Sequence, residues 1–84
     1  KLPLQLQKIS LCESGGQHET ARGKVIVSRT KDVGIMQINL KAHRKTAEAM
    51  NLDLFDANDN MKFAMFLYNK FGPAPWVCWQ RKLV

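Results

Sequence analysis

Cysteine is scarce in this chain of 84 residues, which holds only Cys12 and Cys78, near opposite ends. Two cysteines are too few for a zinc site without nearby histidines, and His18 and His43 show no ligand spacing to them. A disulfide between the two would close a loop of about 67 residues, which the chain-entropy model equates with roughly 4 kcal/mol of stability. It would also imply an oxidising compartment. The alternative is two separate buried thiols.

Long apolar runs are also missing. No run approaches the roughly 18 residues that a helix needs to cross a bilayer, although 45% of the residues are apolar, which is ordinary for a globular fold. The amino-terminal stretch KLPLQLQK lacks the apolar segment of a signal peptide, and the chain does not begin with Met, so we expect a processed or excised domain. Repeats, low-complexity segments and linkers are absent too, so we expect residues 1–84 to form one small domain.

Acidic residues are few: 7 stand against 13 basic residues, which leaves a formal net charge of +6. This balance favours polyanionic partners such as nucleic acid, anionic lipid or a bacterial envelope. The densest basic groups are Lys41, Arg44 and Lys45 and, near the end, Arg81 and Lys82. Neither group is the long basic run of a nucleic-acid arm, and no aromatic-basic RNA motif occurs. We therefore expect no nucleic-acid partner and instead an electrostatic association with an anionic cell envelope.

The first half of the chain contains one clear helical pattern. Apolar residues at helical spacing predict a helix over residues 3–13, which Gly15 and Gly16 end. Residues 17–33 are polar except for a β-branched run at residues 25–27, which predicts a short hairpin or an irregular loop with one strand.

The second half predicts two further helices. The first follows the GIMQIN segment and continues to about Met50, and the second covers residues 60–71, with Asn58 or Asp59 as its cap. The second helix is apolar on two adjoining stripes, which is typical of a central, buried helix. The apolar tail at residues 76–79 is expected to pack back on the body. The predicted fold class is therefore mainly α, with about three helices and a short β-hairpin or loop.

Glu13 is the only acid among the first 18 residues, and it lies where the first predicted helix meets two glycines. Burial and the negative potential of a helix carboxyl end both raise the pKa of a carboxyl group. A general acid that works at neutral pH needs such a raised pKa. The position therefore suits a general acid, although a solvated surface glutamate also fits it.

Residues 34–39, GIMQIN, place two amides among apolar side chains. The amides of Gln37 and Asn39 both donate and accept hydrogen bonds, which suits the hydroxyl and acetamido groups of a sugar. Gly34 lets a ligand approach the backbone closely. The alternative is that the two amides cap or start the following helix.

Three segments carry a resemblance to a known family. They are CESGG at residues 12–16, SRTKDVGIMQIN at residues 28–39, and Asn60-Met61, which opens an apolar helix. In this order and at similar spacing they resemble the lytic transglycosylase SLT domain, which reads ESG, then S-x-x-G-A-x-G-L-M-Q, then an N-I-x-x-G/A helix. The resemblance spans roughly residues 5–79 and implies a lysozyme-like fold.

The resemblance implies cleavage of the β-1,4 bond between N-acetylmuramic acid and N-acetylglucosamine in peptidoglycan. Glu13 matches the family's sole catalytic acid, which protonates the glycosidic oxygen and then acts as base on the muramyl 6-hydroxyl. The product is a 1,6-anhydro sugar, and no water is consumed. The acetamido group of the substrate stabilises the cationic centre, so one carboxylate suffices, unlike in the usual two-carboxylate scheme. Neither a metal nor a cofactor is expected.

The resemblance also implies a set of substrate-binding residues. They are Ser28, Gly34, Met36, Gln37, Asn39 and Tyr68. The Ser28 hydroxyl would hydrogen-bond the Glu13 carboxyl group or the substrate, with a turn role as the alternative. Met36 and Gln37 would form the floor of the cleft. Tyr68 would bring a phenol near Glu13, with a core position as the alternative.

The two cysteines add a second likeness. The CE-[SA]-GG opening and the closing Trp76-Val77-Cys78 also resemble resuscitation-promoting factor domains. In those domains the cysteine before the catalytic glutamate pairs with the one near the end, which implies a Cys12–Cys78 disulfide. Trp76 is expected to pack the tail rather than to stack on a sugar. The implied location is periplasmic, extracellular or cell-wall associated, and the implied protein is a monomer on a peptidoglycan glycan strand.

Some positions depart from the family pattern. Lys31 replaces the usual glycine, and Tyr68-Asn69-Lys70-Phe71-Gly72 only partly matches the A-Y-N-A-G element of longer transglycosylases. Asp32, 19 positions beyond Glu13, could serve as the second carboxylate of a hydrolytic site, but a turn role or an ion pair with Lys31 or Arg29 is favoured. The alternatives to a lytic transglycosylase are a muramidase of the same fold and a non-catalytic peptidoglycan-binding module.

Overall fold

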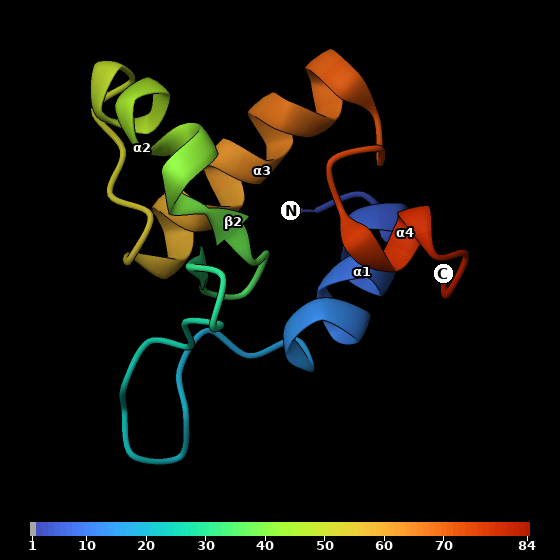
Figure 1. Ribbon diagram of the computed structural model, residues 1–84, viewed down its shortest axis with the longest axis horizontal. Coiled ribbons are helices and arrows are strands. Elements are labelled where there is room, and N and C mark those ends of the chain that lie inside the picture. Colours follow the sequence, from blue (N-terminus) through green and yellow to red (C-terminus); the bar gives the residue numbers. More distant parts are fainter. Residues whose placement is uncertain (1) are drawn as a thin grey trace.

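The computed structural model describes residues 2–84, and in them four helices surround one two-stranded hairpin (Figure 1). The elements are α1 (Leu4–Ser14), β1 (Asp32–Val33), β2 (Ile38–Asn39), α2 (Leu40–Ala49), α3 (Ala57–Phe71) and α4 (Val77–Gln80). The mainly α class predicted from the sequence is confirmed. The fourth helix is an addition to the predicted three, because the tail, expected only to pack on the body, forms one short helical turn.

Helix α1 ends where the two glycines predict. Gly15 has φ of 72° and ψ of 16°, and its N–H donates to the carbonyl oxygen of Leu11 at 3.0 Å. The N–H of Gly16 donates to the carbonyl oxygen of Ser10 at 3.1 Å, so the carbonyls of Ser10 and Leu11 are both satisfied by the two glycines. Glu13 is thereby placed in the last turn of a well-terminated helix.

The β structure forms later in the sequence than the β-branched run predicts. β1 and β2 pair antiparallel, with Asp32 opposite Asn39 and Val33 opposite Ile38. In the predicted strand at residues 25–27, Val25 and Val27 make only isolated bridges. Burial explains the difference, because Val33 and Ile38 are in the core, whereas Val27 is 42% exposed. Residues 17–31 extend away from the helices as a loop (Figure 1).

Helix α3 begins three residues before the predicted start. The Asp56 side chain, rather than Asn58 or Asp59, caps it by accepting the N–H of Asp59 at 3.0 Å. The earlier start places Asn60 inside the helix, where it is fully buried. Asn60 accepts from Met36 N at 3.0 Å and donates to the carbonyl oxygens of Val33 and Leu54. Helix α3 is thereby joined to the hairpin.

The core lies between α1, α2, α3, the hairpin and the tail. Its buried apolar residues are Leu6, Ile9, Met36, Ile38, Ala47, Leu54, Phe63, Ala64, Leu67 and Trp76. Trp76 is 3% exposed, and its indole Nε1–H donates to the carbonyl oxygen of Met36 at 2.8 Å. The expectation that Trp76 packs the tail onto the body is confirmed.

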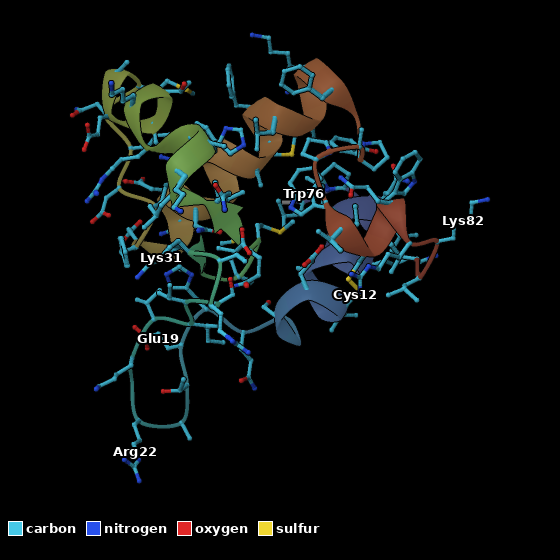
Figure 2. All side chains as sticks on the ribbon, in the orientation of Figure 1. Cys12, Glu19, Arg22, Lys31, Trp76 and Lys82 are labelled. Carbon is cyan, nitrogen blue, oxygen red and sulfur yellow. A yellow bond between two sulfur atoms is a disulfide. The ribbon has the colours of Figure 1, made fainter. Side chains whose placement is uncertain are left out.

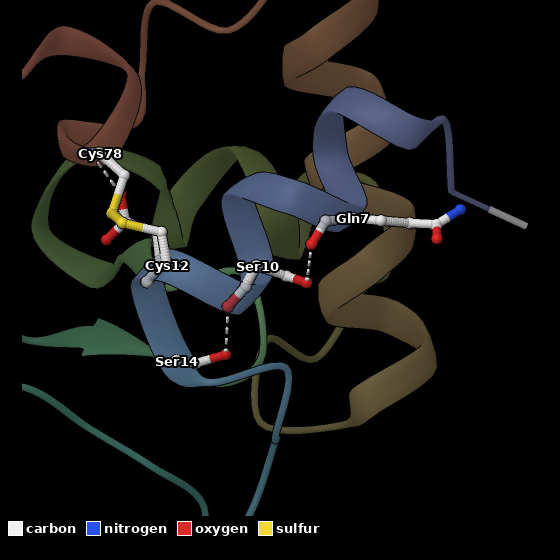
Figure 3. Close-up of a disulfide and its surroundings, with 6 residues drawn as sticks. Gln7, Ser10, Cys12, Ser14 and Cys78 are labelled. Carbon is white, nitrogen blue, oxygen red and sulfur yellow. Dashed lines mark hydrogen bonds between the residues drawn. A yellow bond between two sulfur atoms is a disulfide. The ribbon is translucent and has the colours of Figure 1, made fainter. Parts of the chain in front are cut away.

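A disulfide joins Cys12 in α1 to Cys78 in α4 (Figure 3). The pairing implied by the resemblance is therefore present, and the two cysteines are not separate thiols. The two helices lie side by side (Figure 1). The residue that follows Cys12 is Glu13, so the crosslink attaches the tail immediately beside the candidate acid.

Candidate active site

A small cavity of about 70 Å³ lies where the end of α1, the hairpin, α2 and the tail meet. The residues that line it are Glu13, Asp32, Gln37, Ile38, Asn39, His43, Leu67, Pro75, Trp76 and Val77. Three predicted site residues, Glu13, Gln37 and Asn39, are thus brought together, although Gln37 is 24 positions from Glu13 in the sequence. The lining combines polar and apolar side chains, which can orient a ligand while excluding part of its water.

Glu13 is partly buried at the edge of this cavity. Its carboxylate Oε2 accepts the backbone N–H of Cys78 at 2.9 Å. Together with the disulfide from the neighbouring Cys12, this hydrogen bond fixes the carboxylate relative to the tail. Within residues 2–84 no hydrogen bond reaches Oε1, so that oxygen is left for a ligand.

Asp32 lines the same cavity from β1, and both of its carboxylate oxygens accept hydrogen bonds. Oδ2 accepts from Ser28 Oγ at 2.8 Å and from the Thr30 hydroxyl, and Oδ1 accepts from Asn39 Nδ2 at 2.9 Å. Desolvation raises the pKa of Asp32, but the hydrogen bonds from Thr30, Asn39 and Ser28 together outweigh it and lower the pKa below its ordinary value. Asp32 is therefore a carboxylate at neutral pH. It makes none of the ion pairs considered for it.

The two amides of the GIMQIN segment have different roles. Asn39 caps α2 by accepting Ala42 N at 2.9 Å, while its Nδ2 donates to Thr30 O and to Asp32. The helix-capping alternative is thus confirmed for Asn39, whose amide hydrogens are both used. Gln37 donates only to the carbonyl oxygen of Gly34, at 3.0 Å. It has φ of 50°, an uncommon conformation for a residue other than glycine, and it is the amide with free capacity for a ligand.

His43 is a cavity residue that the sequence analysis considered only as a metal ligand. It lies on α2 with its ring 5.5 Å from that of Phe63. Desolvation by burial lowers the pKa of His43, so the imidazole is neutral at pH 7. One signal could have found it: His43 is four residues after the helix cap Asn39, and positions i and i+4 share a helix face.

Ser28 and Gly34 are close to the cavity but do not line it. Ser28 Oγ donates to Asp32 and accepts the Asp32 N–H at 3.0 Å, so its partner is the second carboxylate and not Glu13. Gly34 is buried with φ of 76°, and a Cβ there would lie 2.6 Å from His18 Nδ1 and 2.7 Å from Asn60 Nδ2. Protein atoms, rather than a ligand, take up the space that this glycine leaves free.

Met36 lies in the core and Tyr68 packs half-buried against it, and neither lines the cavity. Met36 is fully buried with its side chain in the core, and its backbone N–H and carbonyl oxygen make hydrogen bonds to Asn60 and Trp76. The Tyr68 hydroxyl donates to Gln5 Oε1 at 2.6 Å, near the other end of α1 from Glu13. The phenol is therefore not brought to Glu13, and the ring of Tyr68 packs half-buried against the core. Met36 matches the family motif and Tyr68 lies on the predicted buried helix, but neither a motif match nor a helix position reveals the direction of a side chain.

Comparison of this chain with protein-family models, with curated proteins and with solved structures gives no match. Within residues 2–84, no three His, Cys, Asp or Glu side chains gather as metal ligands would. Over the same residues, no helix is both long and apolar enough to cross a membrane. What the described residues offer for function is therefore the chemistry of the cavity, which combines two carboxylates, a neutral imidazole and one free amide with apolar side chains.

Proposed function

We propose that this protein cleaves the β-1,4 bond between N-acetylmuramic acid and N-acetylglucosamine in peptidoglycan, with Glu13 as the general acid. The observation that carries the proposal is that Glu13 shares one cavity with Gln37 and Asn39 of the GIMQIN segment. The resemblance to SLT domains couples these two segments in one reaction. Their meeting in a single cavity is what such a reaction requires.

The first course for the reaction is lytic. Glu13 donates a proton to the glycosidic oxygen and then, as a carboxylate, takes the proton of the muramyl 6-hydroxyl while that oxygen bonds to C1. Its free Oε1 is the oxygen available for this exchange, because Oε2 is occupied by the Cys78 N–H. The product is the 1,6-anhydro sugar, and one carboxylate is enough. The protein is then a peptidoglycan lytic transglycosylase.

A second course, hydrolysis by a muramidase, is favoured by the position of Asp32. Most glycosidases use two carboxyl groups, one as acid and the other ionised as nucleophile or base. Asp32 lines the cavity of Glu13, and the hydrogen bonds that lower its pKa keep it ionised. The two courses leave different products: the lytic one forms anhydro ends, and hydrolysis forms reducing ends.

The size of the cavity indicates how a glycan binds. Its volume of about 70 Å³ is far below the roughly 300–1,000 Å³ of pockets that enclose a whole small ligand. One group of a sugar therefore enters the cavity, and the rest of the strand lies along the surface. Such an open site binds weakly, so we expect a high KM for short glycans. The Cys12–Cys78 disulfide suits the periplasmic, extracellular or wall-associated location of such a substrate.

The deciding experiment is to incubate the protein with purified peptidoglycan and to measure the masses of the muropeptides that it releases. Muropeptides one water lighter than their hydrolysed forms support the lytic course, and reducing ends support the muramidase. Glu13→Gln keeps a carbonyl oxygen for the Cys78 N–H, so the fold is retained, and we expect activity to fall by about 100-fold or more. Binding of glycan without any cleavage by the wild-type protein would contradict the proposal and favour a non-catalytic binding module.

A further inference from the structure

Four basic side chains converge on one groove, separate from the Glu13 cavity. The groove has a volume of about 560 Å³ and lies along the first turns of α2. It is lined by Lys31, Leu40, Lys41, Ala42, Arg44 and Lys45. The sequence places three of these cations close together, and the fold adds Lys31 from the turn before β1.

The charge of this groove is largely unopposed. Within residues 2–84 the one ion pair is Arg44 with Glu48, at 3.7 Å, and both of its side chains are about two-thirds exposed. Lys31, Lys41 and Lys45 make no ion pair there. Exposed pairs of this kind contribute little, so Arg44 can exchange Glu48 for another anion at low cost.

Lys31 occupies a backbone position that would suit glycine better. Its φ is 67°, in the left-handed region that favours glycine. The chain keeps a lysine there although the local turn uses only its backbone, whose N–H donates to Ser28 O and whose carbonyl accepts from Leu40 N. Lys31 instead lines the groove and adds its positive charge there.

We propose that this groove binds a flexible, linear phosphodiester chain without bases, the chemistry of poly(glycerol phosphate) polymers of bacterial walls. A guanidinium with three lysines matches a row of phosphate groups, because Arg44 can bind phosphate oxygens bidentately while the lysines act as point charges. The binding requires no chemistry at Glu13, so it can be tested even if the proposed glycan cleavage fails.

The lining disfavours other polyanions. No aromatic side chain lines the groove, so bases of single-stranded nucleic acid would find no stacking platform. The groove is hollow, and its apolar residues are only Leu40 and Ala42, whereas membrane-surface helices insert large apolar side chains. A slim chain carrying regularly spaced charges fits these features.

A matched pair of lysine variants tests the proposal. Lys31 and Lys82 both have positive φ, 67° and 58°, so replacing either by glycine removes one charge and relieves similar strain. They lie on opposite sides of the molecule (Figure 2). With a synthetic poly(glycerol phosphate) oligomer, we expect Lys31→Gly to raise Kd about threefold to fivefold and Lys82→Gly to leave it unchanged.

A third variant provides a gain of binding. Glu48→Gln removes the anion that competes for Arg44, so Kd should decrease, a result that misfolding cannot imitate. Four phosphate contacts predict a slope of about 3 for log Kd against log salt concentration, and Lys31→Gly should lower that slope by about 1.

The comparison ligands are a thymidine oligonucleotide and polyglutamate of equal charge, and anionic phospholipid vesicles. We expect each to bind more weakly than the glycerol phosphate oligomer. Equal or tighter binding of any of them would overturn the proposal. Equal weakening by Lys31→Gly and Lys82→Gly would also overturn it, because net charge rather than the groove would then determine binding.

Discussion

Gly34 shows at the scale of one residue how the fold constrains the site. It lies between His18 and Asn60, and the His18 ring in turn accepts the Ile35 N–H at Nδ1 and contacts the carbonyl oxygen of Phe55 through Nε2. Because Nδ1 accepts a hydrogen bond, the proton of the neutral ring is on Nε2. The turn that presents Gln37 to the cavity is thereby held from two sides.

We therefore expect Gly34→Ala to lower the free energy of unfolding by about 2–4 kcal/mol, measured by urea denaturation. The added Cβ would combine the cost of a left-handed alanine with overpacking against His18 and Asn60. The control is Gly23→Ala, which has φ of 80° but no atom within 4 Å of its Cβ. It should lose only about 1–2 kcal/mol. Equal losses for the two variants would show that packing around Gly34 contributes nothing.

At the scale of an element, the start of α2 links secondary structure to the cavity. The cap residue Asn39 also donates to Asp32 and to Thr30 O, so one side chain begins the helix and fixes the second carboxylate. Helix α3 has a cap of similar strength, Asp56, which does not line the cavity. A comparison of variants at the two caps therefore distinguishes an effect on helix stability from an effect on the geometry of the site.

Replacing either cap by alanine, Asn39→Ala or Asp56→Ala, should destabilise the protein by about 1 kcal/mol through the lost cap. Only Asn39→Ala should also reduce the release of muropeptides, because Asn39 lines the Glu13 cavity and holds Asp32 in its wall, whereas Asp56 does not line it. Thermal unfolding and product analysis on the same samples measure the two effects. An equal fall in activity for Asp56→Ala would contradict a specific role for Asn39.

The crosslink between α1 and α4 also belongs to the scale of elements. Helix α4 is a single turn of four residues, and the disulfide from α1 is made to its second residue, Cys78. The disulfide and the Cys78 N–H hydrogen bond to Glu13 together position the tail, which in turn supplies Pro75, Trp76 and Val77 to the cavity. The Glu13 carboxylate and the tail residues that line the same cavity are thus parts of one connected unit.

At the scale of the whole molecule, charge determines how stability depends on pH. The folded pKa of His43 is below its ordinary value of 6.5, and that of Asp32 is below 3.8. In each case the unfolded chain takes up a proton at a pH where the folded protein does not. The net charge of +6 at pH 7 rises further as carboxylates are protonated, which adds repulsion of the same sign.

The free energy of unfolding should therefore decrease as the pH falls below about 6.5, and decrease again below about 3.8. Urea denaturation at a series of pH values measures this profile. His43→Gln should remove part of the first decrease and leave the second. A protein that became more stable between pH 7 and pH 5 would contradict the assignment of a neutral, desolvated His43.

Much of the architecture could be predicted from local sequence signals. The end of α1 at Gly15, the helical character of α2 and α3, and the packing of Trp76 follow from apolar spacing and glycine chemistry. The position of the hairpin could not be predicted in this way. β propensity favours a strand at residues 25–27, whereas the paired strands form within residues 32–39, where their apolar side chains are buried. Pairing there buries Val33 and Ile38, and a short sequence does not reveal what will cover them.

The sequence by itself determined the mainly α class, the acid at the end of the first helix and the excess of positive charge, because each depends on residue type and spacing along the chain. Only the tertiary structure decided which side chains meet. It joined Asp32 and His43 to Glu13, placed Tyr68 beside Gln5, and moved Lys31 into the basic groove. Side-chain direction depends on packing between segments distant in sequence, and no local pattern encodes it.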